Sequence, residues 1–171
     1  NKIKAQSIND FYVCSLSTQT IVYKGMFLAE QLSEFYPDLL DNKFTSKFAI
    51  YHQRYSTNTF PTWSLAQPFR VLAHNGEINT LKGNINWMSA HEPRITHPFF
   101  NERINDLKPI LDPDASDSAS LDAAFELFVQ TDRDMPMAKS MIIPESWSNR
   151  SDLSDQLKAM YAYCNAVIEP W

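Results

Sequence analysis

Polar side chains of the kinds that bind a ligand and stabilise a developing charge gather in three short segments of the sequence. These segments are residues 52–59 (HQRYSTNT), 73–79 (AHNGEIN) and 116–120 (SDSAS). Each directly follows or opens an apolar stretch, and sites are usually built where a rigid element ends at an open edge. We therefore treat the three segments as candidate parts of one site.

Asn75 and Gly76 have the chemistry of an oxyanion hole for acyl transfer. An Asn side-chain amide and a neighbouring backbone N–H can donate two hydrogen bonds to the oxyanion of a tetrahedral intermediate, and glycine lets the backbone approach a ligand closely. The alternative is a type I′ hairpin turn, for which Asn-Gly is the strongest short signal. The pair alone favours the turn, but a helix expected from Asn79 leaves no partner strand to complete a hairpin.

Arg54 is a candidate for binding a carboxylate, because a guanidinium can hold one through paired hydrogen bonds. The hydroxyls of Ser56, Thr57 and Thr59 and the amide of Asn58 could complete such a pocket. The alternative is a surface arginine in a structural ion pair, followed by a polar loop. The segment alone favours this second interpretation.

Asp117 lies at the start of a predicted helix. It could be a helix N-cap or an acid stabilised by the helix dipole. It could equally anchor the ammonium group of a substrate. The residue alone does not decide between these roles, and it could serve both.

The two cysteines, Cys14 and Cys164, are predicted to be structural. Cys14 lies within an apolar segment and Cys164 lies on the apolar stripe of the last predicted helix, whereas a reactive thiol needs an exposed, electropositive setting. Two distant cysteines do not form a disulfide framework, so a reducing compartment is expected. The four histidines, at 52, 74, 91 and 97, lack the spacing of a zinc site.

The composition is that of a globular domain that binds neither nucleic acid nor membrane. The chain has 171 residues, 44% of them hydrophobic and 20% charged, with a net charge of −5. A nucleic-acid-binding domain would normally show a basic patch. No apolar run approaches the roughly 20 residues that span a bilayer.

The hydrophobic pattern mixes strands and helices without regular alternation, which predicts an α+β fold. Strands are expected at residues 11–17, 20–24, 47–55, 69–74 and 141–143. Helices are expected around residues 28–36, from Asn79 to near Pro93, from Ser116 or Asp117 through Phe128, and over 153–168, with a loop and a short helix between 91 and 113.

Five segments together resemble the amidotransferase domain of glutamate synthases, within the class II glutamine amidotransferases of the Ntn-hydrolase fold. They are YKGM (23–26), HQRYSTNTFPTW (52–63), LAHNGEINTLKGNINWM (72–88), SDSASLD (116–122) and MIIPESW (141–147). The resemblance covers nearly the whole chain, from about Phe11 to Trp171. It implies a four-layer α/β/β/α sandwich, and it makes residues 1–171 the C-terminal portion of a single amidotransferase domain that is incomplete at its N-terminus.

The resemblance assigns a role to each candidate residue. Arg54 matches the arginine that binds the glutamine α-carboxylate, with Thr57 nearby, and Asn58 stands where related enzymes often have histidine. Asn75 and the Gly76 N–H match the oxyanion hole, and Asp117 matches the acid that holds the glutamine α-amine. The family's nucleophile is an N-terminal cysteine whose own amine is the base. Asn1 cannot replace it, so a fragment that is inert alone is expected.

The resemblance also implies the setting of the reaction. The parent enzyme would use FMN and an iron–sulfur cluster, neither bound by this fragment. The partners would be L-glutamine, the remaining domains of the synthase chain, and a small subunit or ferredoxin. The location would be the cytoplasm, or the plastid in a plant or alga. Two alternatives remain: an amidotransferase domain of another biosynthetic enzyme, and a non-catalytic glutamine-binding fragment.

Overall fold

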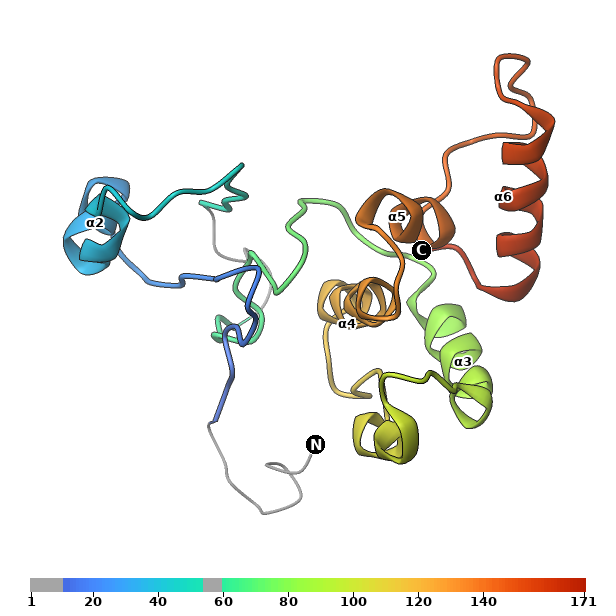
Figure 1. Cartoon of the computed structure of the whole chain (residues 1–171), viewed down its shortest axis with the longest axis horizontal. Helices are drawn as coiled ribbons and strands as arrows, with labels where there is room; N and C mark the ends of the chain where they lie inside the picture. The colour runs from blue at the N-terminus through green and yellow to red at the C-terminus, as the bar shows by residue number, and fades with distance from the viewer. Residues whose placement is uncertain (1–10, 54–59) are drawn as a thin grey trace. The chain divides into compact units, whose positions relative to one another are not determined.

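The computed structural model describes residues 11–53 and 60–171, which form two compact units. One unit is Tyr12–Asn75, and the other comprises Gly76–Trp171 together with Phe11. The helical elements of the described residues are η1 (Ala29–Gln31), α2 (Leu32–Phe35), η2 (Pro37–Leu40), α3 (Leu81–His91), η3 (Glu92–Arg94), η4 (Asn101–Leu107), α4 (Asp117–Gln130), α5 (Met135–Ile142) and α6 (Asp155–Val167) (Figure 1).

The predicted helices are confirmed, and two of them, α4 and α6, begin at side-chain caps. The Ser116 hydroxyl accepts a hydrogen bond from the Ala119 N–H at 3.2 Å, and the Ser154 hydroxyl accepts one from the Leu157 N–H at 3.2 Å. Such caps satisfy backbone donors that a helix leaves unpaired in its first turn. The N-cap of α4 is thus Ser116, which leaves the side chain of Asp117 available for other partners.

The strands predicted at residues 11–17, 20–24 and 69–74, and at 47–53 of the segment 47–55, are not formed in the described part of the chain. Side chains compete with the backbone for the hydrogen bonds that a strand ladder would need. The Val22 N–H donates to the Ser15 hydroxyl at 3.1 Å, and the Cys14 thiol donates to the Val22 carbonyl at 3.3 Å. These bonds bring the segments 11–17 and 20–24 together without forming a strand ladder.

The strand predicted at residues 141–143 is wrong, because these residues end helix α5 and follow it. Asp134 caps this helix, accepting a hydrogen bond from the Met137 N–H at 2.8 Å, and Pro136 lies in the first turn. A short apolar run before a proline fits a buried strand and a buried helix end equally well. The cap and the first-turn proline were the signals that favour the helix.

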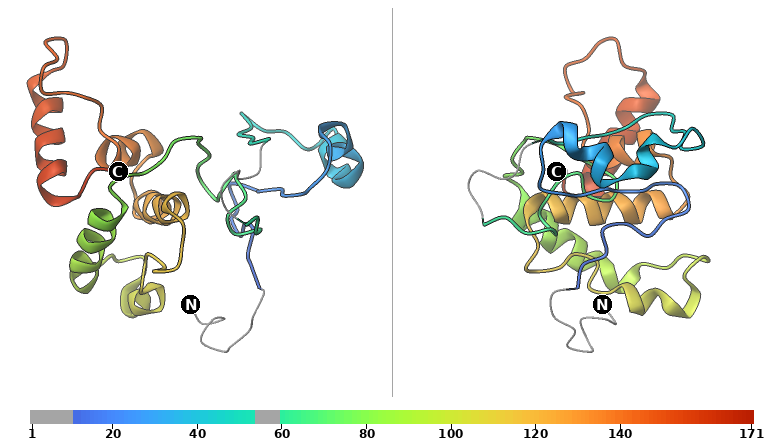
Figure 2. Two further views of the ribbon diagram at one scale, coloured as in Figure 1. Left: turned by 180° about the vertical axis from the view of Figure 1, so that it is seen from behind. Right: turned by 90° about the vertical axis from the view of Figure 1, so that its left-hand side faces the viewer.

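The unit Gly76–Trp171 packs its helices around a small apolar core. Three residues are buried together: Met88 of α3, Ala124 of α4, and Leu111, which precedes α4. Trp171 packs against them. Helix α5 contacts both α4 and α6 and lies between them in the views of Figures 1 and 2. Leu121, Ala124 and Phe125 of α4 are at most 9% exposed, and Phe128 of the same helix packs against the core as a partly buried residue.

Lys24 organises the centre of the unit Tyr12–Asn75. Its ammonium group donates to the carbonyls of Ala66 and Trp63, at 2.6 and 2.9 Å, and to the Tyr12 hydroxyl at 3.0 Å. The same group lies 5.8 Å from the centre of the Phe69 ring. Two of these three hydrogen bonds fix the backbone at Trp63 and Ala66, in the loop that leads into the segment that contains Asn75.

Asn84 joins α3 to the residues at 169 and 170. Its side chain is 2% exposed. Its amide nitrogen donates to the carbonyls of Glu169 at 2.9 Å and Pro170 at 3.0 Å, and its oxygen accepts from the Thr80 hydroxyl at 2.7 Å. Thr80, and not Asn79 as predicted, is the N-cap of α3, and its hydroxyl serves Asn84 in place of a backbone N–H.

Replacing Asn84 with alanine is expected to destabilise α3 by about 1–3 kcal/mol, since the carbonyls of the half-buried Glu169 and Pro170 and the Thr80 hydroxyl lose their partner. The matched control is Asn86→Ala, because Asn86 is an exposed asparagine of the same helix. The measurement is the opening free energy of α3 from hydrogen exchange in the full-length protein. Equal protection of α3 in the two variants would contradict the assigned role of Asn84.

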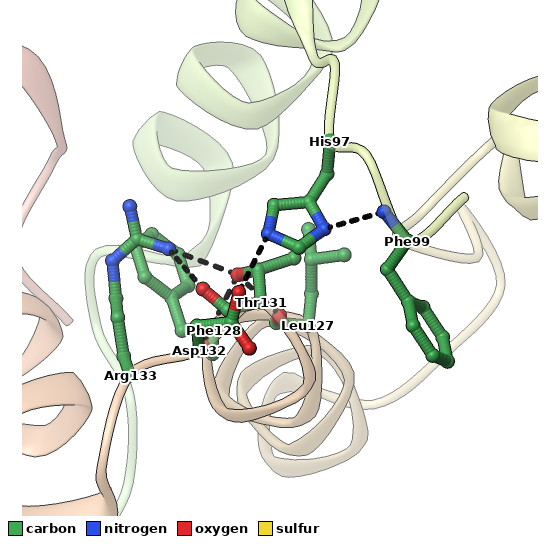
Figure 3. A network of polar contacts seen from close by, with 7 residues as sticks. All are labelled: His97, Phe99, Leu127, Phe128, Thr131, Asp132 and Arg133. Carbon is green, nitrogen blue, oxygen red and sulfur yellow. Dashed lines mark hydrogen bonds and ion pairs between the residues drawn. The ribbon is translucent and has the colours of Figure 1, made fainter. Parts of the chain in front are cut away.

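The C-terminal end of α4 is held by a polar network (Figure 3). The Thr131 hydroxyl lies 2.9 Å from the Leu127 carbonyl, and Arg133 donates to that hydroxyl at 2.9 Å. His97 Nε2 lies 3.2 Å from a carboxylate oxygen of Asp132, whose φ of 66° places it in the left-handed region. These contacts satisfy carbonyls that a helix end leaves unpaired, so α4 is fixed at both ends.

Candidate functional site

Asp117 is the first residue of α4, and its carboxylate is held by three donors. One oxygen accepts from the Ile78 N–H at 3.1 Å. The other accepts from the Ser118 N–H at 2.6 Å and from the Ser118 hydroxyl at 3.1 Å. The structure thus brings Asp117 against the backbone two residues after Gly76. The carboxylate is half-buried at the N-terminal end of a helix, where the helix dipole stabilises negative charge.

The hairpin-turn interpretation of Asn75 and Gly76 is wrong. A type I′ turn requires positive φ at both central residues, and neither Asn75 nor Gly76 has a positive φ. The chain continues into α3 at Leu81 without an intervening strand. Both residues are exposed. The interpretation that remains from the sequence is an open segment able to present an amide and a backbone N–H to a ligand.

Two side chains hold the segment that contains Asn75. The ring nitrogen Nε2 of His52 lies 2.6 Å from the side-chain oxygen of Asn75. The Gln67 side-chain oxygen accepts a hydrogen bond from the His74 N–H at 2.6 Å. The Asn75 side chain and the backbone immediately before it are therefore fixed within the unit Tyr12–Asn75.

The candidate residues for the carboxylate pocket, Arg54, Thr57 and Asn58, lie outside the described residues. Asn75 ends the first unit, whereas Gly76 and Asp117 belong to the second. Within the unit Tyr12–Asn75, the structure shows the contact of Asn75 with His52. Within the unit Gly76–Trp171, it shows the contact of Asp117 with Ile78. The roles of all these residues stay predictions.

The cysteines have the properties of structural residues. Burial raises the pKa of the Cys14 thiol, and the nearby Lys24 offsets only part of this effect. Burial likewise raises the pKa of Cys164, which is 2% exposed, and Arg133 offsets part of it. Both thiols are free of disulfides. A raised pKa lowers the thiolate fraction at neutral pH, which is the opposite of what a nucleophile needs.

Alkylation of the full-length protein by iodoacetamide at pH 8 is expected to modify Cys164 at least about tenfold more slowly than the same residue in the unfolded chain. Cys14 is half-buried and is expected to react at an intermediate rate. Peptide mapping by mass spectrometry gives both rates, and unfolding in urea provides the reference. A rate for either cysteine in the folded protein that matches its rate in urea would show that the thiol is accessible and ionised.

Among residues 11–53 and 60–171, no three His, Cys, Asp or Glu side chains lie together in a way that could hold a metal ion. In the same residues, every helix is too short or too polar to cross a bilayer.

Sequence reasoning missed the contacts made by His52, Gln67 and Ser118. Ser118 follows Asp117 directly, so its contact is local and could have been inferred from a helix start. His52 precedes the candidate Arg54 by two residues, a spacing that places two side chains on one face of an extended segment. That spacing was the available signal for His52. Gln67 gave no comparable signal.

The sequence matches one protein family along its whole length and is similar to several named proteins. The model of the class II glutamine amidotransferases matches residues 1–171. The chain is 61% identical over 169 residues to the "Glutamate synthase [NADPH] large chain" of Azospirillum brasilense, and 52% identical over 162 residues to that of Bacillus subtilis strain 168.

It is also 48% identical over 166 residues to the chloroplastic ferredoxin-dependent glutamate synthase of Spinacia oleracea. These alignments cover 99%, 95% and 95% of the chain, but only 11%, 11% and 10% of the three relatives. The chain therefore spans about a tenth of the length of the curated relatives it matches. Because the family model covers all 171 residues, the chain belongs to the class II glutamine amidotransferases.

Proposed function

We propose that this chain is the glutamine-binding and oxyanion-stabilising part of a glutamate synthase. Water and the amide of L-glutamine react to give glutamate and ammonia, and the ammonia passes to a second site that aminates 2-oxoglutarate. The observation that carries the proposal is the Asp117 carboxylate held against the backbone that follows Gly76. This contact lies two residues after Gly76, and a carboxylate there is suited to binding a substrate ammonium.

Each site residue has one task in this proposal. Arg54, with Thr57 and Asn58, binds the α-carboxylate of glutamine, and Asp117 binds its α-amine. The Asn75 amide and the Gly76 N–H donate to the oxyanion that forms when the amide carbon is attacked. The attacking thiol belongs to a cysteine outside these 171 residues, because the raised pKa values of Cys14 and Cys164 argue against both.

The remaining properties of the parent enzyme are proposed from the relatives. In the fold, residues 1–171 contribute the C-terminal portion of one four-layer α/β/β/α domain, whose sheets would include the segments that the sequence predicts as strands. FMN and an iron–sulfur cluster belong to other parts of the parent, since such a cluster takes several Cys ligands and this sequence has two cysteines. The partners are those other domains and a small subunit or ferredoxin, in the cytoplasm or the plastid.

The test is a glutaminase assay of the full-length protein carrying Arg54→Ala, Asn75→Ala or Asp117→Ala. Each variant is expected to lose most of its activity, the first and third mainly through weaker glutamine binding and the second mainly through turnover. Near-wild-type hydrolysis of L-glutamine by all three variants would contradict the proposed function.

A further inference from the structure

His52 contacts the side chain of Asn75, and this contact decides which end of the Asn75 amide is available to a ligand. The distance from His52 Nε2 to Asn75 Oδ1 is 2.6 Å. An amide oxygen only accepts hydrogen bonds, so Nε2 must carry the proton and donate. With Oδ1 engaged, the amide nitrogen of Asn75 points away from the ring. Asn75 is exposed, so this nitrogen is open to a ligand.

The other ring nitrogen of His52 does not oppose this arrangement. Nδ1 is buried and has no hydrogen-bond partner among the described residues. A hydrogen-bond partner at Nδ1 would determine which ring nitrogen of His52 carries the proton, independently of Asn75. In its absence, the hydrogen bond to Asn75 is the interaction within the described residues that selects the Nε2–H form.

We propose that His52 is a positioning residue that holds the Asn75 amide with its N–H groups toward the oxyanion. This inference rests on the proposed function, in which Asn75 is an oxyanion donor. Rotating the amide by half a turn would exchange its oxygen and nitrogen and direct an oxygen at the developing negative charge. An oxyanion hole acts through donors that are oriented before the reaction. While Nε2 carries its proton, His52 disfavours the unproductive orientation, because the flipped amide would set its N–H groups against another donor.

The backbone at this position is fixed by a separate contact. Gln67 accepts from the His74 N–H at 2.6 Å, immediately before Asn75. Gln67 therefore fixes the position of the backbone next to Asn75, and His52 fixes the orientation of the Asn75 side-chain amide. Losing His52 alone should leave Asn75 in place and randomise only its amide.

Three substitutions of His52 in the full-length protein separate orientation from packing. His52→Phe keeps a ring but removes the donor, and it is expected to lower kcat for glutamine hydrolysis about tenfold with little change in KM. His52→Gln places an amide N–H near the position of Nε2 and is expected to recover most of the loss. His52→Asn is the matched control, since its shorter side chain carries the same amide near the position of Nδ1, and it should resemble His52→Phe.

The double variant His52→Phe/Asn75→Ala distinguishes this inference from the proposed function. It is expected to be no slower than Asn75→Ala alone, because His52 acts only through Asn75. If Asn75→Ala is severely impaired while His52→Phe keeps a kcat within twofold of wild type, the positioning role is wrong and the proposed function stands. If Asn75→Ala itself is unimpaired, Asn75 is not an oxyanion donor, and the inference that rests on that role fails with it. Should His52→Phe not fold, equal kcat values for the Gln and Asn variants would overturn the inference.

Discussion

Replacing Asn75 with alanine in the full-length protein is expected to lower kcat for glutamine hydrolysis by on the order of a hundredfold or more. In the proposed function, the Asn75 amide donates to an oxygen that carries charge only in the transition state and the tetrahedral intermediate. An interaction made only there affects turnover and leaves ground-state binding nearly unchanged. We therefore expect KM for glutamine to stay within about threefold of wild type. Steady-state measurement of glutamate release gives both constants.

Two controls make the Asn75 result specific. Asn86→Ala makes the same chemical change at an exposed position of α3 and should leave kcat unchanged. Synthesis driven by added ammonia bypasses glutamine hydrolysis, so Asn75→Ala should retain it. A loss of ammonia-driven synthesis parallel to the loss of hydrolysis would show that the substitution acts through the fold and not through the oxyanion.

Replacing Asp117 with asparagine is expected to lower kcat/KM for glutamine on the order of a hundredfold, mainly through KM. Removing one partner of a desolvated charge pair typically costs about 2–5 kcal/mol, and each 1.4 kcal/mol is tenfold. Asparagine keeps one acceptor oxygen that can still bind the Ile78 N–H. The decrease in kcat/KM would therefore reflect mainly the loss of the negative charge that faces the substrate ammonium, and not the loss of the hydrogen bond to the Ile78 N–H.

The matched control for Asp117 lies in another helix. Asp155 is also the first residue of a helix and also follows a serine N-cap, but it is exposed. Asp155→Asn removes the same charge from the same local position and should leave kcat/KM within about twofold of wild type. If the two variants behave alike, Asp117 serves the helix and not the substrate. Initial-rate kinetics with L-glutamine measures both.

The helices were predictable because their signals are local. Ser116 and Ser154 cap α4 and α6, and the apolar positions of each helix recur at helical spacing behind the cap. Pro37 ends α2 as predicted, and it also begins η2. Caps, periodicity and proline act within a few residues, so the sequence shows them directly.

The strand predictions failed because a strand-like pattern shows only that a segment suits a pleated surface. A strand forms only when its backbone pairs with a second strand. β-Branched and aromatic residues at 11–17 and 20–24 suit a pleated, half-buried surface, but their backbone groups take side-chain partners such as Ser15. At residues 141–143 the apolar run itself was ambiguous, and the cap at Asp134 decided for a helix. Long-range pairing is the part of the fold that short sequence patterns do not contain.

The candidate site divides in the same way. Asn75, Gly76 and Asp117 could be identified as chemically suited residues, yet each had an ordinary structural interpretation of equal or greater weight. The φ angles removed the hairpin interpretation of Asn75 and Gly76. The contact of His52 with Asn75 spans 23 residues, and that of Asp117 with Ile78 spans 39. Contacts over such separations depend on the fold and not on local spacing.

The hydrogen bond between Ile78 and Asp117 links ligand affinity to loop order. The carboxylate proposed to hold the substrate amine also accepts from the backbone two residues beyond Gly76. A ligand that draws Asp117 into one position also restrains the segment that carries the Gly76 N–H. Such coupling is reciprocal. If ordering the loop raises the affinity for the ligand by some factor, binding the ligand raises the equilibrium constant for ordering the loop by the same factor. Glutamine would thus help to assemble the donor that its own hydrolysis requires.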